Sequence, residues 1–417
     1  MIRIMTSGEY SGRSKIVKSP LPDVSEKVSA IIARVKEHGD AALRDYALEF
    51  DGVRLEEIEV DPAEISRSAE SVSSEYIRIL SDAAENIKNF HERQKSGEFM
   101  YSPRPGIILG QRAIPIKRAG IYVPGGTAAY PSSVLMNAIP ARVAGVEEII
   151  MSTPNPSAEI LAAAKIAGVS RVFRIGGAQA IAAMAYGTET VPSADKITGP
   201  GNIYVAEAKR QVSGDVGIDM TAGPSEIMII ADKNNYPAHI AADMLAQAEH
   251  DPNASAVLLT PSRRMAQAVS CEIENRLPKL PRYDTARKSI DSNGAIILVK
   301  NIYDAADIAN DYAPEHLELC VDNPFEYMTY IRRAGSIFIG RNSPEALGDY
   351  WAGVNHILPT MGTARFSSPL SVSDFVTRQQ YVYYSEAELS RVSRSIESFA
   401  ASEGLSGHAE SISIRRE

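Results

Sequence analysis

Hydrophobic positions change their spacing about 120 residues into the chain. Before that point apolar residues recur at helical spacing, first over about 28–35 and again over 61–92. Asp23 and Ser25 can cap the first of these segments, and Gly39 can end it. The N-terminal region is therefore predicted to be helical, and it carries no evident chemistry.

From Ala119 onward, short apolar runs alternate with alanine-rich segments of helical spacing. In the first series AGIYV, EEIIMS, SRVFRI and ADKIT are predicted strands, and helices follow from Ser132, from Ser157 and after Gly176-Gly177. In the second series SEIMIIA, ASAVLLT, GAIILV, HLELCV and GSIFIG are predicted strands, with helices near 237–249, 262–276 and 303–310. This alternation is typical of βαβ units and parallel sheets, so we predict an α/β protein with two Rossmann-like domains.

Four segments follow from this pattern. Residues 1–118 form an N-terminal helical segment, expected to pack with the second α/β domain, and residues 119–223 form the first α/β domain. Residues 224–366 form the second α/β domain. Residues 367–417 form a small C-terminal extension with one amphipathic helix, near 386–401, and a polar tail.

Size and composition fit a soluble protein of more than one domain. A chain of 417 residues exceeds what one hydrophobic core usually supports. The net charge of −9 argues against nucleic acid or an anionic membrane as the main partner. The N-terminal stretch has no apolar run of signal-peptide length, so a cytoplasmic location is expected. Cys271 and Cys320 are too few for a disulfide framework or a cysteine-based zinc site.

Three glycine-rich turns follow predicted strands, at 125–126, 176–177 and 199–201. Backbone amides at such turns can receive a phosphate group. The signal is weak, because glycine is common in βα loops and the chain has neither a Walker A sequence nor a GxGxxG turn after the first strand of either series.

Four of the seven histidines have neighbours that suggest chemistry; His38, His91 and His239 are interpreted as structural or solvated. Gln247 and His250 are three residues apart, which places them on one face of a helix. Glu315 and His316 are adjacent at the entrance of a predicted strand, and such a pair suits two separate proton transfers. A structural role remains open for both pairs.

The other two histidines lie near acidic residues. Asp349 and His356 flank a loop that holds the single tryptophan, Trp351, whereas Glu403 and His408 lie in the C-terminal tail. Gln247, His250, Asp349 and His408 together form a set of nitrogen and oxygen donors that suits Zn²⁺. Such a site would be catalytic or substrate-orienting.

Several long segments, in this order, closely resemble histidinol dehydrogenases. They are AGIYVPGGTAAYPSSVLMNAIPARVAG, GGAQAIAAMAYGTE, ITGPGNIYVAEAKR, DMTAGPSEIMIIAD, LAQAEHDPNA, NDYAPEHLEL, GDYWAGVNHILPT and EGLSGH. The resemblance runs from about residue 20 to the C-terminus and is strongest over 118–380. It implies a homodimer in which the C-terminal extension reaches the partner's active site.

The resemblance also implies a reaction: L-histidinol is oxidised through L-histidinaldehyde to L-histidine, with two NAD⁺ and one zinc ion per subunit. It implies that Glu315 and His316 transfer protons and that zinc binds Gln247, His250, Asp349 and His408. NAD contacts are expected from Tyr122, Gln179 and Asn202. Substrate contacts are expected from Ser225, Gln247, His250, His316, Asp349, His356, Glu403 and His408.

Three alternatives compete with this interpretation. A paralogue with the same zinc and NAD machinery would act on another small alcohol, such as a sulfonated diol. A zinc hydrolase would explain the histidines and carboxylates but not the glycine-rich turns. A nucleotide-binding module without catalysis would show no dependence on a metal.

Overall fold

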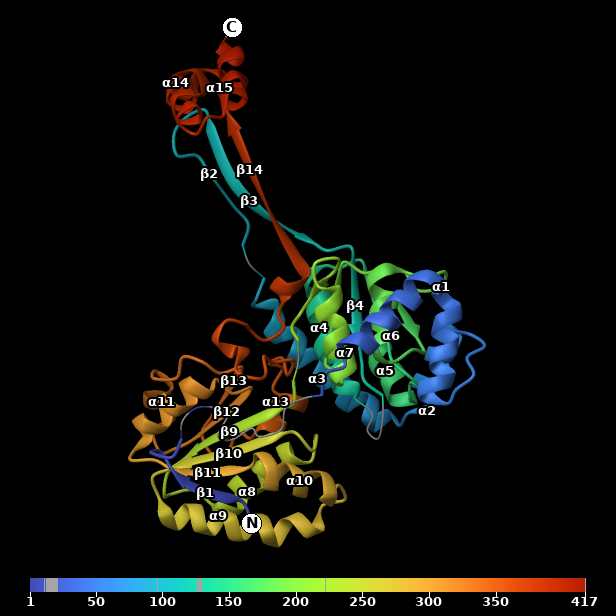
Figure 1. The fold of residues 1–417 in the computed structure, drawn as a ribbon, viewed down its shortest axis with the longest axis vertical. Helices are drawn as coiled ribbons and strands as arrows, with labels where there is room; N and C mark the ends of the chain where they lie inside the picture. Colours follow the sequence, from blue (N-terminus) through green and yellow to red (C-terminus); the bar gives the residue numbers. More distant parts are fainter. Residues whose placement is uncertain (11, 13–21, 96, 126–129, 222, 417) are drawn as a thin grey trace. The chain divides into compact units, whose positions relative to one another are not determined.

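The computed structural model describes residues 1–10, 12, 22–95, 97–125, 130–221 and 223–416. The chain divides into two compact units. The first unit contains Met1–Gln94 and Ile116–Phe375, and the second contains Lys95–Pro115 and Val376–Glu417. The first unit holds two parallel sheets, which are visible in Figure 1 as two groups of strands.

The first sheet has five parallel strands in the order β6-β5-β4-β7-β8. The chain proceeds from β4 outward to β6 and then returns to place β7 on the other side of β4. The carboxyl ends of β4 and β7 therefore flank the point where the strand order reverses, where α/β sheets usually bind ligands. The strands are β4 (Arg118–Tyr122), β5 (Glu148–Ser152), β6 (Arg171–Phe173), β7 (Lys196–Thr198) and β8 (Gly217–Ile218).

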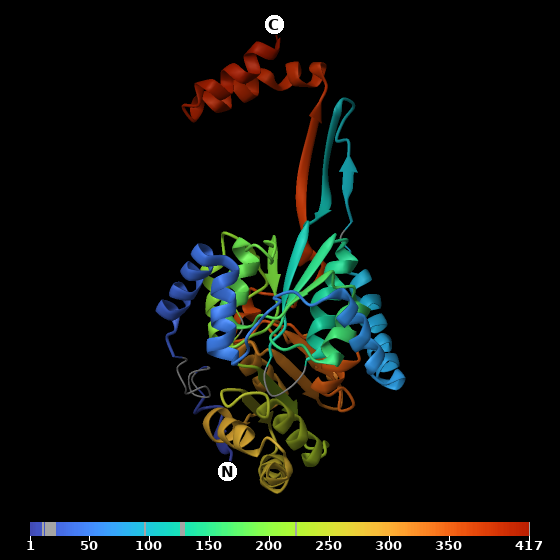
Figure 2. The same cartoon turned by 90° about the vertical axis from the view of Figure 1, so that its right-hand side faces the viewer.

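Helices cover both faces of this sheet (Figure 2). The crossover helices are α4 (Pro131–Ala144), α5 (Ala158–Ala167), α6 (Gly177–Tyr186) and α7 (Ile203–Val212). Outside them lie α1 (Ser25–Asp51), α2 (Pro62–Ser71) and α3 (Ser74–Glu92). Helix α1 packs on α6 and α7, α2 packs on α5, and α3 packs on α4. The N-terminal helices thus pack on the first α/β domain, whereas the sequence predicted packing with the second.

Among the described residues of the N-terminal segment, a single short strand joins the second sheet. That strand, β1 (Arg3–Thr6), pairs in parallel with β11 at the edge of a six-stranded sheet in the order β1-β11-β10-β9-β12-β13. Hydrophobic periodicity did not predict β1, because four residues with alternating half-buried and exposed side chains give little hydrophobic signal.

The second sheet is wholly parallel, and its central strands are buried on both faces, which explains their continuous apolar sequences. Its other strands are β9 (Glu226–Ala231), β10 (Ser255–Thr260), β11 (Ala295–Leu298), β12 (His316–Cys320) and β13 (Ser336–Ile339). Its helices are α8 (Pro237–Ala248), α9 (Arg263–Arg276), α10 (Tyr283–Asn293), α11 (Ile302–Tyr312), α12 (Pro324–Met328) and α13 (Glu345–Tyr350).

The second unit combines an antiparallel sheet with a helical hairpin. The sheet has the order β14-β3-β2, formed by β2 (Phe99–Tyr101), β3 (Ile107–Pro115) and β14 (Val376–Tyr384). The hairpin contains α14 (Glu386–Ser402) and α15 (Ser406–Ser413). The hydrophobic pattern predicted α14, but the residues after it were interpreted as a polar tail, whereas they form α15. The pairing of β3 with β14 of the C-terminal extension was not predicted.

Two details of the predicted helices differ from the structure. Gly39 lies at a kink inside α1, with φ of +50°, and the chain remains helical as far as Asp51. The stretch over 61–92 is divided into α2 and α3 near Val72, which has extended backbone angles. The α/β fold class itself is confirmed by the two parallel sheets. Among the described residues, no helix is both long and apolar enough to cross a bilayer.

Phe173, at the end of β6, lies in the core between the first sheet and the N-terminal helices, so a substitution there tests this packing. Its side chain is 0% exposed and packs in the cluster that includes Val28 and Leu43 of α1. Phe173→Ala is expected to lower the free energy of unfolding by about 3–5 kcal/mol, measured by urea denaturation. Phe325→Ala, at a position 70% exposed, is the matched control. Equal losses in the two variants would contradict this account.

Candidate functional site

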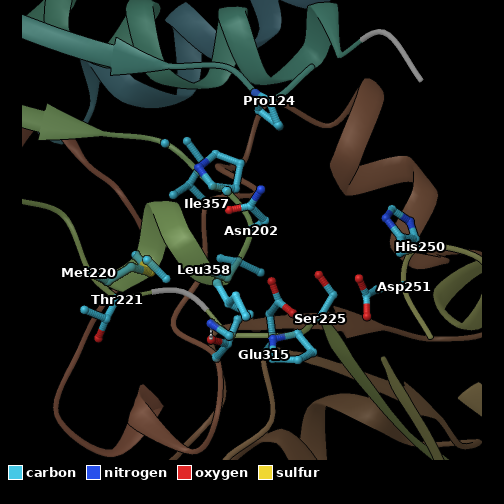
Figure 3. Close-up of a pocket in the computed structure, with 18 of the residues that line it drawn as sticks. Pro124, Asn202, Met220, Thr221, Ser225, His250, Asp251, Glu315, Ile357 and Leu358 are labelled. Atoms are coloured by element: carbon cyan, nitrogen blue, oxygen red, sulfur yellow. Dashed lines mark hydrogen bonds between the residues drawn. The ribbon is translucent and has the colours of Figure 1, made fainter. Parts of the chain in front are cut away.

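A pocket of about 800 Å³ lies in the first unit and is lined by residues of both parallel sheets (Figure 3). From the first sheet it receives the turns at the carboxyl ends of β4 and β7, including Pro124, Gly125 and 199–202. These turns flank the reversal of strand order described above. Two of the three glycine-rich turns seen in the sequence therefore border the pocket, with Gly126 outside the described residues.

The second sheet contributes the amino ends of its strands. Ser225 directly precedes β9, Glu315 directly precedes β12 and His316 begins it, and all three line the pocket. In Figure 3 Ser225 and Glu315 lie next to one another at the pocket wall. The sequence-based expectation that Glu315 and His316 reach a cleft from a strand entrance agrees with this position.

The main chain of Glu226 holds both Glu315 and His316. Its amide donates a hydrogen bond to the Glu315 carboxyl group at 2.8 Å, and its carbonyl lies 3.0 Å from Nδ1 of His316. A carbonyl oxygen can only accept, so Nδ1 of His316 carries the proton and Nε2 keeps its lone pair. Among the described residues, Nε2 is buried without a hydrogen-bond partner. His316 therefore presents an unprotonated, buried nitrogen at the pocket wall.

Burial sets the protonation of this pair. Loss of solvation raises the pKa of Glu315 well above its ordinary value, and the amide of Glu226 opposes that effect. Loss of solvation lowers the pKa of His316 to about 4, against the attraction of Asp349. Burial therefore favours the protonated form of the Glu315 carboxyl group and the neutral form of the adjacent His316 imidazole.

A third acidic group, Glu345, completes the surroundings of His316. Its carboxylate lies 3.4 Å from Nδ1 of His316, and potential ligand atoms of His316, Glu345 and Asp349 lie within 4.8 Å of one another. Burial, followed by the charge of Asp349, raises the pKa of Glu345 well above its ordinary value. Glu345 was not predicted from the sequence as a site residue. Its spacing of four residues from Asp349 places both carboxyl groups on one face of α13.

Gln247 and His250 approach this cluster from α8. Gln247 is fully buried in the last turn, and its amide nitrogen, in the orientation that satisfies its neighbours, donates to the Glu345 carboxylate at 3.0 Å. His250 lies just beyond the helix and lines the pocket. Gln247 therefore contacts the cluster through Glu345 and does not itself line the pocket. The nitrogen and oxygen atoms of His316, Glu345 and Asp349 lie close enough together to fit a divalent cation such as Zn²⁺.

His356 also lines the pocket, from the loop after α13. Its Nδ1 lies 3.7 Å from the Asp349 carboxylate, and burial lowers the pKa of its imidazole, opposed by Asp349. Trp351, in the same loop, is 45% exposed and is not part of the pocket wall.

Glu403 and His408 belong to the second unit. Glu403 ends α14 and His408 lies in α15, and both side chains are exposed within the chain. Their expected contribution to a metal and substrate site therefore stays a prediction.

The three residues expected to contact NAD have different surroundings. Asn202 lines the pocket and caps α7, accepting from the amides of Tyr204 and Val205 at 3.0 and 3.2 Å. Tyr122 and Gln179 are buried beside the Gly176-Gly177 turn, where the Tyr122 hydroxyl accepts a hydrogen bond from the Gly177 amide at 3.0 Å. They do not line the pocket described above.

The fold and site together define a class: a two-sheet α/β enzyme whose pocket joins a glycine-rich ligand-binding edge to a buried acid–imidazole pair. The family model for histidinol dehydrogenase matches residues 16–416. The chain is 51% identical to a histidinol dehydrogenase of Geobacter sulfurreducens, over 99% of this chain and 96% of that protein. It is 50% identical to one of Streptococcus mutans, over 98% and 96%.

A solved structure gives the same result. The crystal structure of histidinol dehydrogenase from Elizabethkingia anophelis superposes with a TM-score of 0.94 at 36% identity, covering 99% of this chain and 98% of that one. The chain belongs to the histidinol dehydrogenase family and is an NAD-dependent oxidoreductase. The resemblance inferred from the sequence is confirmed.

Glu318 lies on β12, two residues beyond His316, and contacts the site through Glu345. Its carboxyl group is fully buried and accepts a hydrogen bond from the Glu345 amide, at the start of α13, at 2.9 Å. Burial, together with the nearby Asp243, raises the pKa of Glu318 to about 8. An unfolded chain loses this proton near pH 4.5, so the stability that Glu318 contributes is present below that pH and is lost as pH rises through about 8.

Glu318→Gln is expected to flatten the pH dependence of stability between pH 5 and 8, because glutamine keeps the acceptor oxygen and never ionises. Urea denaturation across this range measures the effect. Glu49→Gln, on the exposed surface of α1, is the control and should follow the wild-type profile. The account of Glu318 fails if the Glu318→Gln profile stays parallel to that of the wild type.

Proposed function

We propose that this protein catalyses the zinc-dependent, four-electron oxidation of L-histidinol through L-histidinaldehyde to L-histidine with two NAD⁺, the last steps of histidine biosynthesis. The observation that carries the proposal is the buried Glu315–His316 pair, with the partnerless Nε2 of His316 in the pocket wall. Family membership over nearly the whole chain supports the choice of substrate.

In the first oxidation His316 acts as the base. Nδ1 is held by the Glu226 carbonyl, so Nε2 is the nitrogen that accepts the hydroxyl proton of the substrate. NAD⁺ would accept the hydride that leaves the carbon atom bearing this hydroxyl group. A well-placed base contributes roughly 10²–10⁴-fold to such a step.

In the second oxidation Glu315 activates water. Its raised pKa means that, once ionised, the carboxylate holds a proton taken from water more tightly than an ordinary glutamate would. The hydroxide equivalent adds to the carbonyl carbon of the aldehyde, and the resulting hydrate can lose the second hydride. Ser225, which hydrogen-bonds to Glu315, helps to keep the carboxyl group at the pocket wall.

The zinc ion would be held by Gln247, His250, Asp349 and His408. His250 and Asp349 line the pocket, Gln247 contacts Glu345 beside them, and oxygen and nitrogen atoms of these kinds are usual zinc ligands. A bound zinc ion would supply a Lewis acid that orients the imidazole and amino nitrogens of the substrate and so fixes the reacting carbon. Glu345 is one of the group around His316 and would help to hold Gln247 in position.

Substrate contacts in this proposal come from Ser225, Gln247, His250, His316, Asp349, His356, Glu403 and His408. We assign the NAD contacts to Tyr122, Gln179 and Asn202. Asn202 lies on the pocket wall, and Tyr122 and Gln179 support a glycine-rich turn. A homodimer, with Glu403 and His408 supplied to the site by the neighbouring subunit, is part of the same proposal. Exposed aromatic residues on the second unit, such as Phe99 and Tyr383, suit such an interface.

The reaction is tested by its stoichiometry. Limiting L-histidinol, excess NAD⁺ and zinc are expected to yield two NADH per substrate, measured by absorbance at 340 nm. Removal of the metal with a chelator should abolish NADH formation, and added Zn²⁺ should restore it. One NADH per substrate, or full activity in the metal-free protein, would argue against the proposal.

The division of labour between the two adjacent residues is tested by single-turnover assays of each half-reaction. Glu315→Gln is expected to slow aldehyde oxidation far more than alcohol oxidation, because it removes only the base for water. His316→Asn should slow both, by about 10²-fold or more. If Glu315→Gln reduced the two half-reactions equally, the assigned roles would be wrong.

A further inference from the structure

A buried ion pair lies directly behind the turn that follows β7. Lys209, on α7, pairs with Asp219, which follows β8, and each side chain is only 1% exposed. The pair lies outside the acid–imidazole cluster and takes no part in the proton transfers proposed above.

Both charged groups bind the same residue of the turn, Gly199. The ammonium group of Lys209 donates to the Gly199 carbonyl at 2.9 Å, and the Asp219 carboxylate accepts from the Gly199 amide at 2.8 Å. The other oxygen of Asp219 accepts from the Met220 amide at 2.6 Å. Asp219, Met220 and the whole 199–202 turn line the pocket. The ion pair therefore binds both the carbonyl and the amide of Gly199.

Gly199 itself leaves the turn little freedom. Its φ is +119°, and a Cβ atom there would overlap the carbonyl oxygen of Tyr122. Three residues later the chain enters α7 through the Asn202 cap. A small shift at Gly199 would therefore move Asn202 and the start of α7, which line the pocket.

Stability alone is a weak reason for such a pair. Removing two charges from water is unfavourable, and well-packed apolar side chains often do as well in their place. What an apolar pair could not supply is a donor for the Gly199 carbonyl together with an acceptor for its amide.

We propose that Lys209 and Asp219 are positioning residues that set the geometry of the 199–202 turn and thereby the affinity for the dinucleotide. This inference rests on the proposed function, because it takes Asn202 and its turn as part of the NAD site. The pair acts on NAD⁺ binding through the main chain of Gly199 and leaves histidinol binding, at the other sheet, unchanged.

The experiment uses two variants of the full-length, zinc-loaded enzyme. Asp219→Asn keeps an acceptor oxygen but loses the charge that holds Lys209, and Lys209→Met removes the donor to Gly199. Each is expected to raise KM for NAD⁺ and the Kd for NADH roughly tenfold or more, with KM for histidinol within about twofold and kcat at saturating NAD⁺ largely kept. NADH fluorescence measures the Kd directly and requires no turnover.

Lys196→Met is the matched control. Lys196 begins β7, at the opposite end of the strand from Gly199, and it pairs with Asp374 at 2.8 Å. The Lys196→Met substitution removes an ion pair from the same strand without a change at the 199–202 turn. The KM values for NAD⁺ and for histidinol should therefore match those of the wild type. If Lys209→Met fails to fold, Asp219→Asn and the NADH titration still test the proposal.

The outcomes separate this inference from the proposed function. Unchanged NADH affinity in a folded Asp219→Asn variant would overturn the positioning role, as would equal rises in KM for NAD⁺ and histidinol. A wild-type protein that formed no NADH from histidinol would instead contradict the proposed function, whatever the variants showed.

Discussion

The main chain of one residue of β9, Glu226, holds the two side chains on which the proposed chemistry depends. The amide of Glu226 binds Glu315, and its carbonyl binds His316. Parallel pairing of β9 with β12 sets His316 opposite Ile227, so the positions of both side chains are fixed by the register of the central sheet. Moving either side chain away would break its hydrogen bond to the main chain of a strand that is buried on both faces.

Burial then gives this pair its electrostatic character. A carboxyl group that resists ionisation lies beside an imidazole that resists protonation, and the fixed tautomer leaves one nitrogen as the base. The same burial brings Glu345 and Asp349 close to His316, a concentration of carboxyl groups that a divalent cation would stabilise. In the proposed function this cluster takes part in both metal binding and proton transfer.

The pocket joins opposite ends of two sheets. The first sheet offers the carboxyl ends of its strands, where glycine turns and helix starts provide backbone amides. The second sheet offers the amino ends of β9 and β12, which bring side chains instead. The general rule for parallel sheets predicts the first arrangement but not the second. This division agrees with a reaction in which one partner is a dinucleotide and the other is a small polar alcohol.

The sequence by itself determined the two α/β domains and several members of the site. Continuous apolar strands and helical spacing are local properties, and Glu315 and His316 could be located because a strand entrance is visible in the pattern. Glu345 could have been found by its helical spacing from Asp349, but no sequence signal linked it to Gln247, nearly a hundred positions earlier.

Only the tertiary structure decided which surfaces meet. It placed α1 to α3 on the first sheet, paired 95–115 with β14, and enclosed Lys209 and Asp219 behind the Gly199 turn. Contacts of this kind depend on the register and packing of segments far apart along the chain. Hydrophobic periodicity records that a face is buried, but not which partner buries it.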